Sequence, residues 1–179
     1  MIKLAVFDGD GSFWRYSNSY GSSWRAIAEV CGVAEESEEL LQRYYSRREL
    51  EKEWAREQAK LFSGKSTRVA EQQLFPIPYI MGLTDLIREA RARAIAVGLL
   101  TSGVDFVARR AALEQRLDFC FCNILYTNNG VFTGIVDPAV PMWGKHLVLD
   151  RIIRNRNLKP EEVVYFGASG NDVKCMEMA

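Results

Sequence analysis

The chain has 179 residues, 48% hydrophobic and 26% charged, which is the composition of a globular protein with a sizeable core. Lys and Arg number 23, as do Asp and Glu, so no net charge attracts nucleic acid or an anionic membrane. No apolar run reaches the roughly 18 residues of a membrane span, and the N-terminus lacks a signal-peptide pattern. Four cysteines, with only Cys120 and Cys122 close together, are too few for a secreted disulfide scaffold, so we expect a reducing cytoplasm.

The N-terminal residues predict a buried strand that ends in a polar loop. Residues 2–7 form a short, mainly apolar run, and Asp8-Gly9-Asp10-Gly11 follows it directly. Residues 19–75 then show apolar residues at helical spacing, with acidic and basic residues interleaved on the other faces. We expect this helical segment to lie over the end of the first strand as a lid.

Strands and helices alternate in the rest of the chain. We expect a helix over 83–93, a strand over 95–100, a turn at 101–103, a helix over 105–117, a strand over 119–121, a hairpin-like turn at 128–130, a strand over 131–136, a helix over 145–155 and a strand over 163–166. Such alternation builds a parallel sheet covered on both faces. The chain therefore predicts an α/β fold with a Rossmann-like parallel sheet and an all-helical insertion after the first strand.

Polar residues follow three of the predicted strands. They are Asp8 and Asp10, Thr101 and Ser102, and Asn171 and Asp172. In open parallel sheets, ligands bind beyond the carboxyl ends of the strands. We therefore expect these side chains to surround one site.

The chemistry of the first pair points to a cation and to phosphate. Two carboxylates close together in an apolar neighbourhood repel each other, so a cation should bind them. Mg²⁺ prefers oxygen ligands and is typically held by one or two carboxylates, water and substrate phosphate. Gly9 and Gly11 allow close backbone approach and leave amide groups free for phosphate oxygens. A strand-end Asp can also act as a nucleophile and form an aspartyl-phosphate.

Four ordered motifs resemble those of the haloacid dehalogenase superfamily of phosphatases. Asp8-Gly9-Asp10-Gly11-Ser12 resembles the first motif, Thr101 the second, Lys145 the third and residues 167–172 the fourth. Within the superfamily, residues 100–176 are most similar to phosphoserine phosphatases. The resemblance implies a Rossmann-like core formed by residues 1–12 and 81–179, with a helical cap formed by residues 13–80.

The resemblance also implies Mg²⁺-dependent hydrolysis of a small phosphorylated metabolite. Asp8 would attack the phosphorus atom, while Asp10 would give a proton to the leaving alkoxide and later take one from water. The phosphate-binding residues would be Gly9, Thr101, Ser102, Lys145 and Asn171, and the metal ligands Asp8, Asp10 and Asp172. Because Asp10 supplies a proton that halide would not need, its presence favours phosphate over a halogenated substrate.

Three positions depart from the family pattern. Ala168 stands where family members usually carry an Asp that binds magnesium directly, so the site is engineered, naturally weak or naturally inactive. Ser17 stands where phosphoserine phosphatases carry a Glu that recognises the amino group of serine. Arg56 is a candidate partner for a substrate carboxylate. Phosphoserine is therefore the nearest named substrate without being assigned.

Several alternatives fit the same residues. A phosphotransferase would pass the phosphoryl group to an alcohol, and a binding module would keep the phosphate pocket without turnover, which Ala168 favours. Asp8 and Asp10 are also compatible with simple turn or cap residues, and Lys145 with a surface position. If no strand follows residues 163–166, they form an exposed sheet edge, through which we expect a homodimer.

Overall fold

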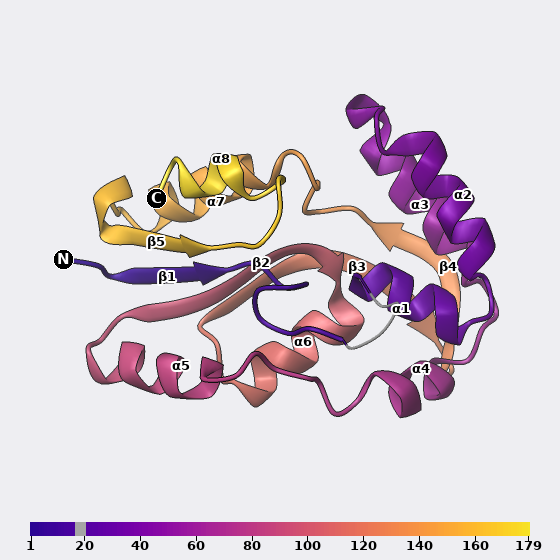
Figure 1. Cartoon of the computed structure of the whole chain (residues 1–179), viewed down its shortest axis with the longest axis horizontal. Coiled ribbons are helices and arrows are strands. Elements are labelled where there is room, and N and C mark those ends of the chain that lie inside the picture. The colour runs from indigo at the N-terminus through magenta and orange to yellow at the C-terminus, as the bar shows by residue number, and fades with distance from the viewer. Residues whose placement is uncertain (17–20) are drawn as a thin grey trace.

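A computed structural model describes residues 1–16 and 21–179 and contains a five-stranded sheet of order β4-β3-β2-β1-β5 (Figure 1). The strands are β1 (Leu4–Phe7), β2 (Ala96–Val104), β3 (Phe119–Asn128), β4 (Val131–Asp137) and β5 (Val163–Phe166). Strands β5, β1, β2 and β3 are parallel, and β4 is antiparallel to β3. The predicted α/β class with a mainly parallel sheet is confirmed.

Helices cover both faces of the sheet (Figure 1). One face carries α5 (Leu83–Ala92) and α6 (Asp105–Glu114), and the other carries α7 (Lys145–Asn155), the short 3₁₀ helix η2 (Pro160–Glu162) and α8 (Val173–Met176). Successive side chains of a strand point to opposite faces. Accordingly, Leu4 and Val6 pack in the cluster under α7, whereas Ala5 and Phe7 pack in the cluster under α5 and α6. This double burial explains why β1 is apolar at every position.

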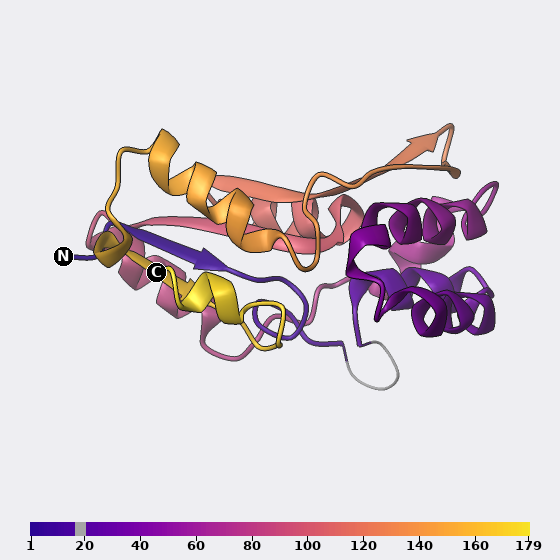
Figure 2. The ribbon, with the colours of Figure 1, turned by 90° about the horizontal axis from the view of Figure 1, so that it is seen from above.

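The insertion after β1 is helical, as predicted. It contains α1 (Ser23–Val30), α2 (Ala34–Tyr44), the 3₁₀ helix η1 (Arg48–Leu50), α3 (Glu51–Leu61) and α4 (Thr67–Leu74). Figure 2 shows α1 to α4 gathered at one end of the molecule, beyond the carboxyl end of β1. Among the residues that the structure describes, no helix has the length and apolar character needed to cross a bilayer.

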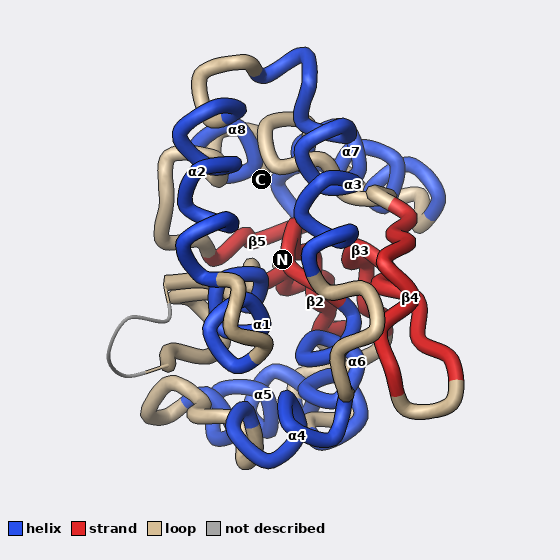
Figure 3. The backbone as a smooth tube through the Cα atoms, turned by 90° about the vertical axis from the view of Figure 1, so that its right-hand side faces the viewer, coloured by secondary structure: helices blue, strands red, loops and turns tan. Residues whose placement is uncertain are grey.

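The hairpin formed by β3 and β4 lies alongside this helical group (Figure 3). The N–H of Gly64 donates to the carbonyl of Phe132 at 2.8 Å, and the N–H of Phe132 donates to the carbonyl of Lys65 at 2.9 Å. The N–H of Thr67 donates to the carbonyl of Gly130 at 2.9 Å. These backbone bonds hold the insertion beside the sheet.

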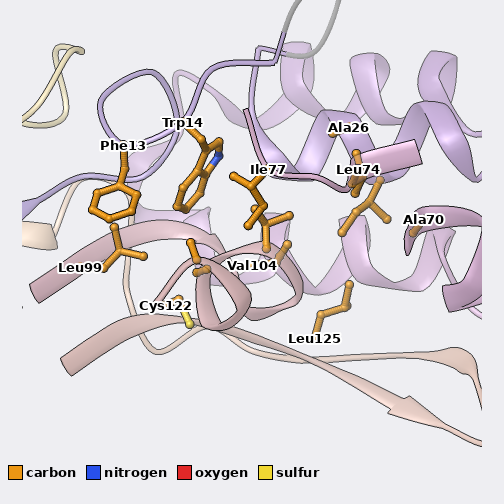
Figure 4. Packing of buried hydrophobic residues seen from close by; sticks show 14 of the residues in the cluster. Phe13, Trp14, Ala26, Ala70, Leu74, Ile77, Leu99, Val104, Cys122 and Leu125 are labelled. Atoms are coloured by element: carbon orange, nitrogen blue, oxygen red, sulfur yellow. The ribbon is translucent and has the colours of Figure 1, made fainter. Parts of the chain in front are cut away.

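Residues 13–14 pack in the core directly after the polar loop. Figure 4 shows Phe13 and Trp14 above Leu99 of β2, and both aromatic side chains are almost completely buried. Phe13 also contacts Phe7 edge to face, with ring centroids 5.6 Å apart. The loop that carries Asp8 and Asp10 therefore rests on a rigid aromatic base.

Strands β2 and β3 are longer than predicted. The predicted turn at 101–103 is wrong, because β2 continues to Val104, with a register shift between Leu100 and Val104 where it pairs with β3. The carbonyl of Ser102 accepts a hydrogen bond from the side chain of Asn123 on β3, which holds this stretch extended. Strand β3 continues to Asn128 because β4 pairs with its second half.

The predicted hairpin turn is present between β3 and β4. Asn129 and Gly130 have φ angles of 48° and 75°. Two successive left-handed residues are what a two-residue hairpin loop requires, and Asn-Gly adopts them readily. The edge position expected for residues 163–166 is also observed, since β5 pairs only with β1 in the described part of the chain.

Candidate active site

The loop after β1 presents two carboxylates at the end of the sheet. The N–H of Asp8 donates to the carbonyl of Phe166 at 2.8 Å, which fixes Asp8 between β1 and β5. The carbonyl of Gly9 then accepts from the N–H of Phe13 at 2.8 Å, so the chain folds back on itself. A Cβ atom at position 9 would lie 2.7 Å from the ring of Trp14 and 2.8 Å from Thr101 Oγ1. Only glycine fits at this close approach.

Lys145, the first residue of α7, lies at the centre of a buried ionic cluster. Its Nζ atom is 2.8 Å from Asp8 Oδ1, 2.7 Å from Asp172 Oδ1 and 3.3 Å from Asn171 Oδ1. Three acceptors match the three protons of the ammonium group. Because Lys145 is 0% exposed, it is not a surface residue. The structure thus brings together the ends of β1 and β5 and the start of α7.

The cluster sets the ionisation of its members. Burial raises the pKa of Asp8 above its usual value, although the charge of Lys145 opposes this. Burial acts to lower the pKa of Lys145, but the charges of Asp8 and Asp172 outweigh it and raise that pKa. Burial also acts to raise the pKa of Asp172, but Lys145 outweighs it and lowers that pKa. At neutral pH the buried ammonium is therefore charged, and Asp8 remains the less stabilised carboxylate.

Asp172 acts as a hub for the loop after β5. Its Oδ1 accepts from Lys145 and from the hydroxyl of Tyr165 at 2.9 Å. Its Oδ2 accepts from the N–H of Ala168, from the N–H of Ser169 and from Ser169 Oγ. A carboxylate offers about four lone-pair sites, and five donor groups already contact these two oxygens. Asp172 therefore orients Lys145 and ties the loop after β5 to it.

Asp10 is held by two residues that the motifs did not identify. The indole N–H of Trp14 donates to Oδ1 at 2.8 Å, as does the backbone N–H of Ser23, and Ser23 Oγ donates to Oδ2 at 3.0 Å. Burial, followed by the charge of Asp8, raises the pKa of Asp10 to about 6. Such a carboxyl can both give and take a proton near neutral pH. The sequence signal for Ser23 was only its place at the start of a predicted helical stretch.

The end of β2 supplies hydroxyl and amide groups beside Asp10. Thr101 is 1% exposed, and its Oγ1 accepts from the N–H of Gly103 at 3.0 Å. A Cβ atom at position 103 would lie 3.0 Å from Asp10 Oδ2. The carbonyl of Ser102 accepts from the indole N–H of Trp24 at 3.0 Å. This last bond connects helix α1 directly to the strand end.

A cavity of about 430 Å³ joins these groups to the helical insertion. Five of the predicted site residues line it, namely Asp8, Asp10, Thr101, Ser102 and Asn171. Gly9 and Lys145 lie behind this lining, with Lys145 supporting Asp8 from the buried side. The alternative that Asp8 and Asp10 are simple turn residues leaves this convergence unexplained.

Arg56, a predicted substrate residue, is not among the described residues that line the cavity. Arg56 is exposed, whereas Trp54, Ala55 and Gln58 of the same helix line the cavity. In an α-helix, residues two positions apart point about 200° apart, so Arg56 cannot share the face of Trp54. Ser17 lies outside the described residues.

The described residues offer a hard cation few protein ligands of their own. Among residues 1–16 and 21–179, no cluster of three or more His, Cys, Asp or Glu side chains could hold a metal ion. Asp8 borders the cavity and accepts from Lys145 and from the N–H of Gly9, which leaves acceptor capacity on its carboxylate. Its raised pKa marks a buried negative charge that a cation would stabilise. These residues fit a magnesium ion that takes its other ligands from water and substrate.

Comparison with known proteins places the chain among hydrolases. The model for haloacid dehalogenase-like hydrolases matches residues 5–177. The phosphoserine phosphatase of Archaeoglobus fulgidus is 28% identical over 154 residues, which cover 86% of this chain and 45% of the relative. The phosphoserine phosphatase of Lactococcus lactis subsp. lactis is 30% identical over 131 residues, which cover 72% of this chain and 60% of the relative. The chain thus spans about half of the length of these two relatives.

A solved structure shares the fold. It is described as a phospho-aspartyl intermediate analogue of phosphoserine phosphatase, and it superposes with a TM-score of 0.81 at 23% identity. The superposition covers 99% of this chain and 83% of that chain. At this identity the likeness shows the architecture alone.

Proposed function

The chain belongs to the haloacid dehalogenase-like hydrolase family, and from this premise we propose that it hydrolyses a small phosphomonoester in the manner of a phosphoserine phosphatase. The observation that carries the proposal is the placement of Asp8. It borders the cavity and is held from behind by the buried Nζ of Lys145 at 2.8 Å, while Asp10 and Thr101 line the same space.

The reaction proceeds in two steps at Asp8. In the first step, a carboxylate oxygen of Asp8 attacks phosphorus, the bond from phosphorus to the alcohol oxygen breaks, and the alkoxide takes a proton from Asp10. In the second step, Asp10 takes a proton from water as the water oxygen attacks phosphorus. The bond to Asp8 then breaks and inorganic phosphate leaves. Asp10 suits both steps because its pKa is raised to about 6.

Residues around Asp8 hold the phosphoryl oxygens. Thr101 Oγ1 already accepts from Gly103, so its own proton is free for a phosphoryl oxygen. Ser102 and Asn171 line the same cavity and supply further polar groups. Lys145 keeps Asp8 oriented and contributes positive charge from the buried side. We assign these residues, with the backbone at Gly9, to phosphate binding.

Magnesium would bind at Asp8 and at the backbone carbonyl of Asp10. Its other ligands would be water and substrate phosphate, as is usual for this ion. When bound, it would neutralise charge on the phosphoryl group. We do not assign Asp172 as a ligand, because Lys145, Tyr165, Ala168 and Ser169 already donate to its two oxygens.

A second candidate function is phosphate binding without turnover. Ala168 is exposed beside the loop of Gly11, and its Cβ lies 3.6 Å from where a Cβ of residue 11 would be. The side chain that would complete a metal site therefore has room but no carboxylate. Ala168 in place of the family's usual Asp therefore favours a chain that binds phosphorylated metabolites without cleaving them.

The surroundings of the site lead to two further proposals. We propose that residues 13–80 serve as a cap, since Trp24, Gln58 and other side chains of its helices line the cavity. We also propose a cytoplasmic location. The four cysteines Cys31, Cys120, Cys122 and Cys175 are all free, as is common in a reducing compartment.

Phosphate release from a panel of phosphorylated metabolites, measured with Mg²⁺, tests the proposed function. The variants are Asp8→Asn, which should abolish turnover, and Ala168→Asp, which should raise it. Ala168→Asn is the matched control, since it has nearly the same shape without the charge. Product analysis with an added alcohol separates hydrolysis from phosphotransfer. Phosphate release by Asp8→Asn at the parental rate would refute the role of Asp8. Metabolite binding without turnover in both the parent and Ala168→Asp would favour the binding module.

A further inference from the structure

The cavity next to Asp8 is lined by three tryptophan residues from different parts of the fold. Resting on the proposed function, we propose that the leaving group of the substrate carries a planar aromatic ring, which stacks on these indoles. Trp24 comes from α1, Trp54 from α3 and Trp143 from the segment between β4 and α7, and all three line the cavity. Planar rings stack well on indole, whereas a serine side chain has no surface to offer them.

Trp24 is held in place at the phosphate end of the cavity. Its indole N–H donates to the carbonyl of Ser102 at 3.0 Å, so the ring is tied to the end of β2. It also stacks on Phe62, with ring centroids 6.2 Å apart and planes at 30°. A phosphate bound at Ser102 therefore brings the group that it carries next to this indole.

Trp143 is held in place by contacts from the cap. Its backbone N–H donates to Glu51 Oε2 at 3.0 Å. The guanidinium of Arg48 lies 4.1 Å from the ring centroid, and Tyr45 meets the ring edge on with centroids 5.7 Å apart. A ring that is already oriented loses little conformational freedom when a ligand stacks on it. The contacts thus fix the orientation of the Trp143 ring at the cavity.

Two charged side chains of the cavity wall, Arg25 and Glu38, are paired with each other, and the lining residue Lys52 is exposed. Arg25 is 3.1 Å from Glu29 and 2.8 Å from Glu38, and Glu51 accepts from Trp143. An amino-acid phosphate that used Arg25 for its carboxylate would have to break the pair with Glu38, whereas a neutral ring leaves that pair intact. The volume of about 430 Å³ is also within the range of roughly 300–1,000 Å³ seen for pockets of drug-sized ligands.

Binding of two phosphonates tests this inference independently of turnover. Benzylphosphonate and cyclohexylmethylphosphonate carry the same charged group and a six-membered ring, and they differ in the planarity of that ring. Neither can be hydrolysed. By titration calorimetry with Mg²⁺, we expect the benzyl compound to bind about tenfold more tightly, in line with the effect of losing one stacking partner. Equal affinities, or no binding of either compound, would overturn the inference.

Tryptophan variants test whether the indoles cause the preference for benzylphosphonate over cyclohexylmethylphosphonate. Trp54→Leu and Trp143→Leu should each reduce the affinity ratio to below about threefold. The control is Tyr126→Leu, which removes an exposed aromatic ring outside the cavity lining and should leave the ratio unchanged. A ratio that survives both tryptophan changes would overturn the assignment. Phosphate release from benzyl phosphate is measured in parallel: a binding preference without release would support the ligand class and count against the proposed hydrolysis.

Discussion

The buried ammonium of Lys145 should contribute to the stability of the folded protein, and this can be tested by removing its charge. Lys145→Met keeps most of the aliphatic length of the side chain and removes its charge. In the folded protein, Asp8 and Asp172 would then remain buried without the ammonium that lies 2.8 and 2.7 Å from them. Breaking a buried ion pair on one side costs about 3–5 kcal/mol.

The Lys145→Met variant can instead protonate one of the two buried carboxyls, and this costs a similar free energy. If burial makes one carboxyl take up a proton at pH 7, the free-energy cost is set by the difference between pH 7 and its usual pKa of 3.8. At 1.36 kcal/mol per pH unit, this amounts to about 4 kcal/mol. Because a domain of this size changes its melting temperature by roughly 2–4 °C per kcal/mol, we expect a drop of about 8–16 °C.

The loss should also depend on pH in a defined direction. Lys145 lowers the pKa of Asp172, so in the parent the ionised carboxylate contributes stability above pH 3.8, and this is lost as pH falls through the folded value. Without Lys145, burial raises the pKa instead, so the variant recovers as the carboxyl is protonated. The difference in the free energy of unfolding between the parent and Lys145→Met should therefore be largest near pH 7 and shrink toward pH 4.

Equilibrium unfolding in urea at several pH values measures this effect. Lys174→Met, which removes an exposed lysine, is the control and should change the free energy of unfolding by less than about 0.5 kcal/mol. The double variant Lys145→Met/Asp172→Asn should regain part of the loss, because it removes the second buried charge. A loss below about 1 kcal/mol for Lys145→Met, or one that stays constant with pH, would refute the reasoning.

Three other predictions concern the site, the core and the sheet edge. Ser23→Ala removes the hydroxyl donor to Asp10 and should lower kcat by about 10- to 100-fold in steady-state assays, with KM changed less. This loss is a part of the roughly 10²–10⁴-fold that a general acid contributes. An unchanged kcat would argue against this positioning role. Gly98→Ala would place a Cβ atom 2.1 Å from the ring of Phe119 and should cost at least 1–3 kcal/mol in urea unfolding, whereas Gly170→Ala, with no atom within 4 Å, should be nearly neutral. Equal losses would contradict the packing. In the described part of the chain β5 is an edge strand, so we expect self-association, which sedimentation velocity at rising concentration would detect. A monomer throughout would count against it.

Local patterns in the sequence were enough for the elements whose neighbours in the chain determine them. The helix Lys145–Asn155 and the strand Val163–Phe166 have the predicted bounds. The same holds for the hairpin turn, because Asn129 and Gly130 adopt left-handed angles at little cost. Helical periodicity likewise predicted the insertion after β1. These features depend on a few adjacent residues, so a single sequence contains them.

The sequence predicted that the polar residues after three strands would surround one site, but only the tertiary structure decided which of their atoms are in contact and how they are ionised. Lys145 and Asp8 are 137 positions apart, and their contact exists because β1 lies beside β5 and under α7. That same neighbourhood saturates Asp172 with donors, which a motif cannot show. The extension of β2 through Thr101 depends on its partner strand, and the exposure of Arg56 depends on which face of α3 meets the cavity. Pairing between distant segments, burial and helix rotation are properties of the folded chain, because they depend on packing between elements that the sequence separates.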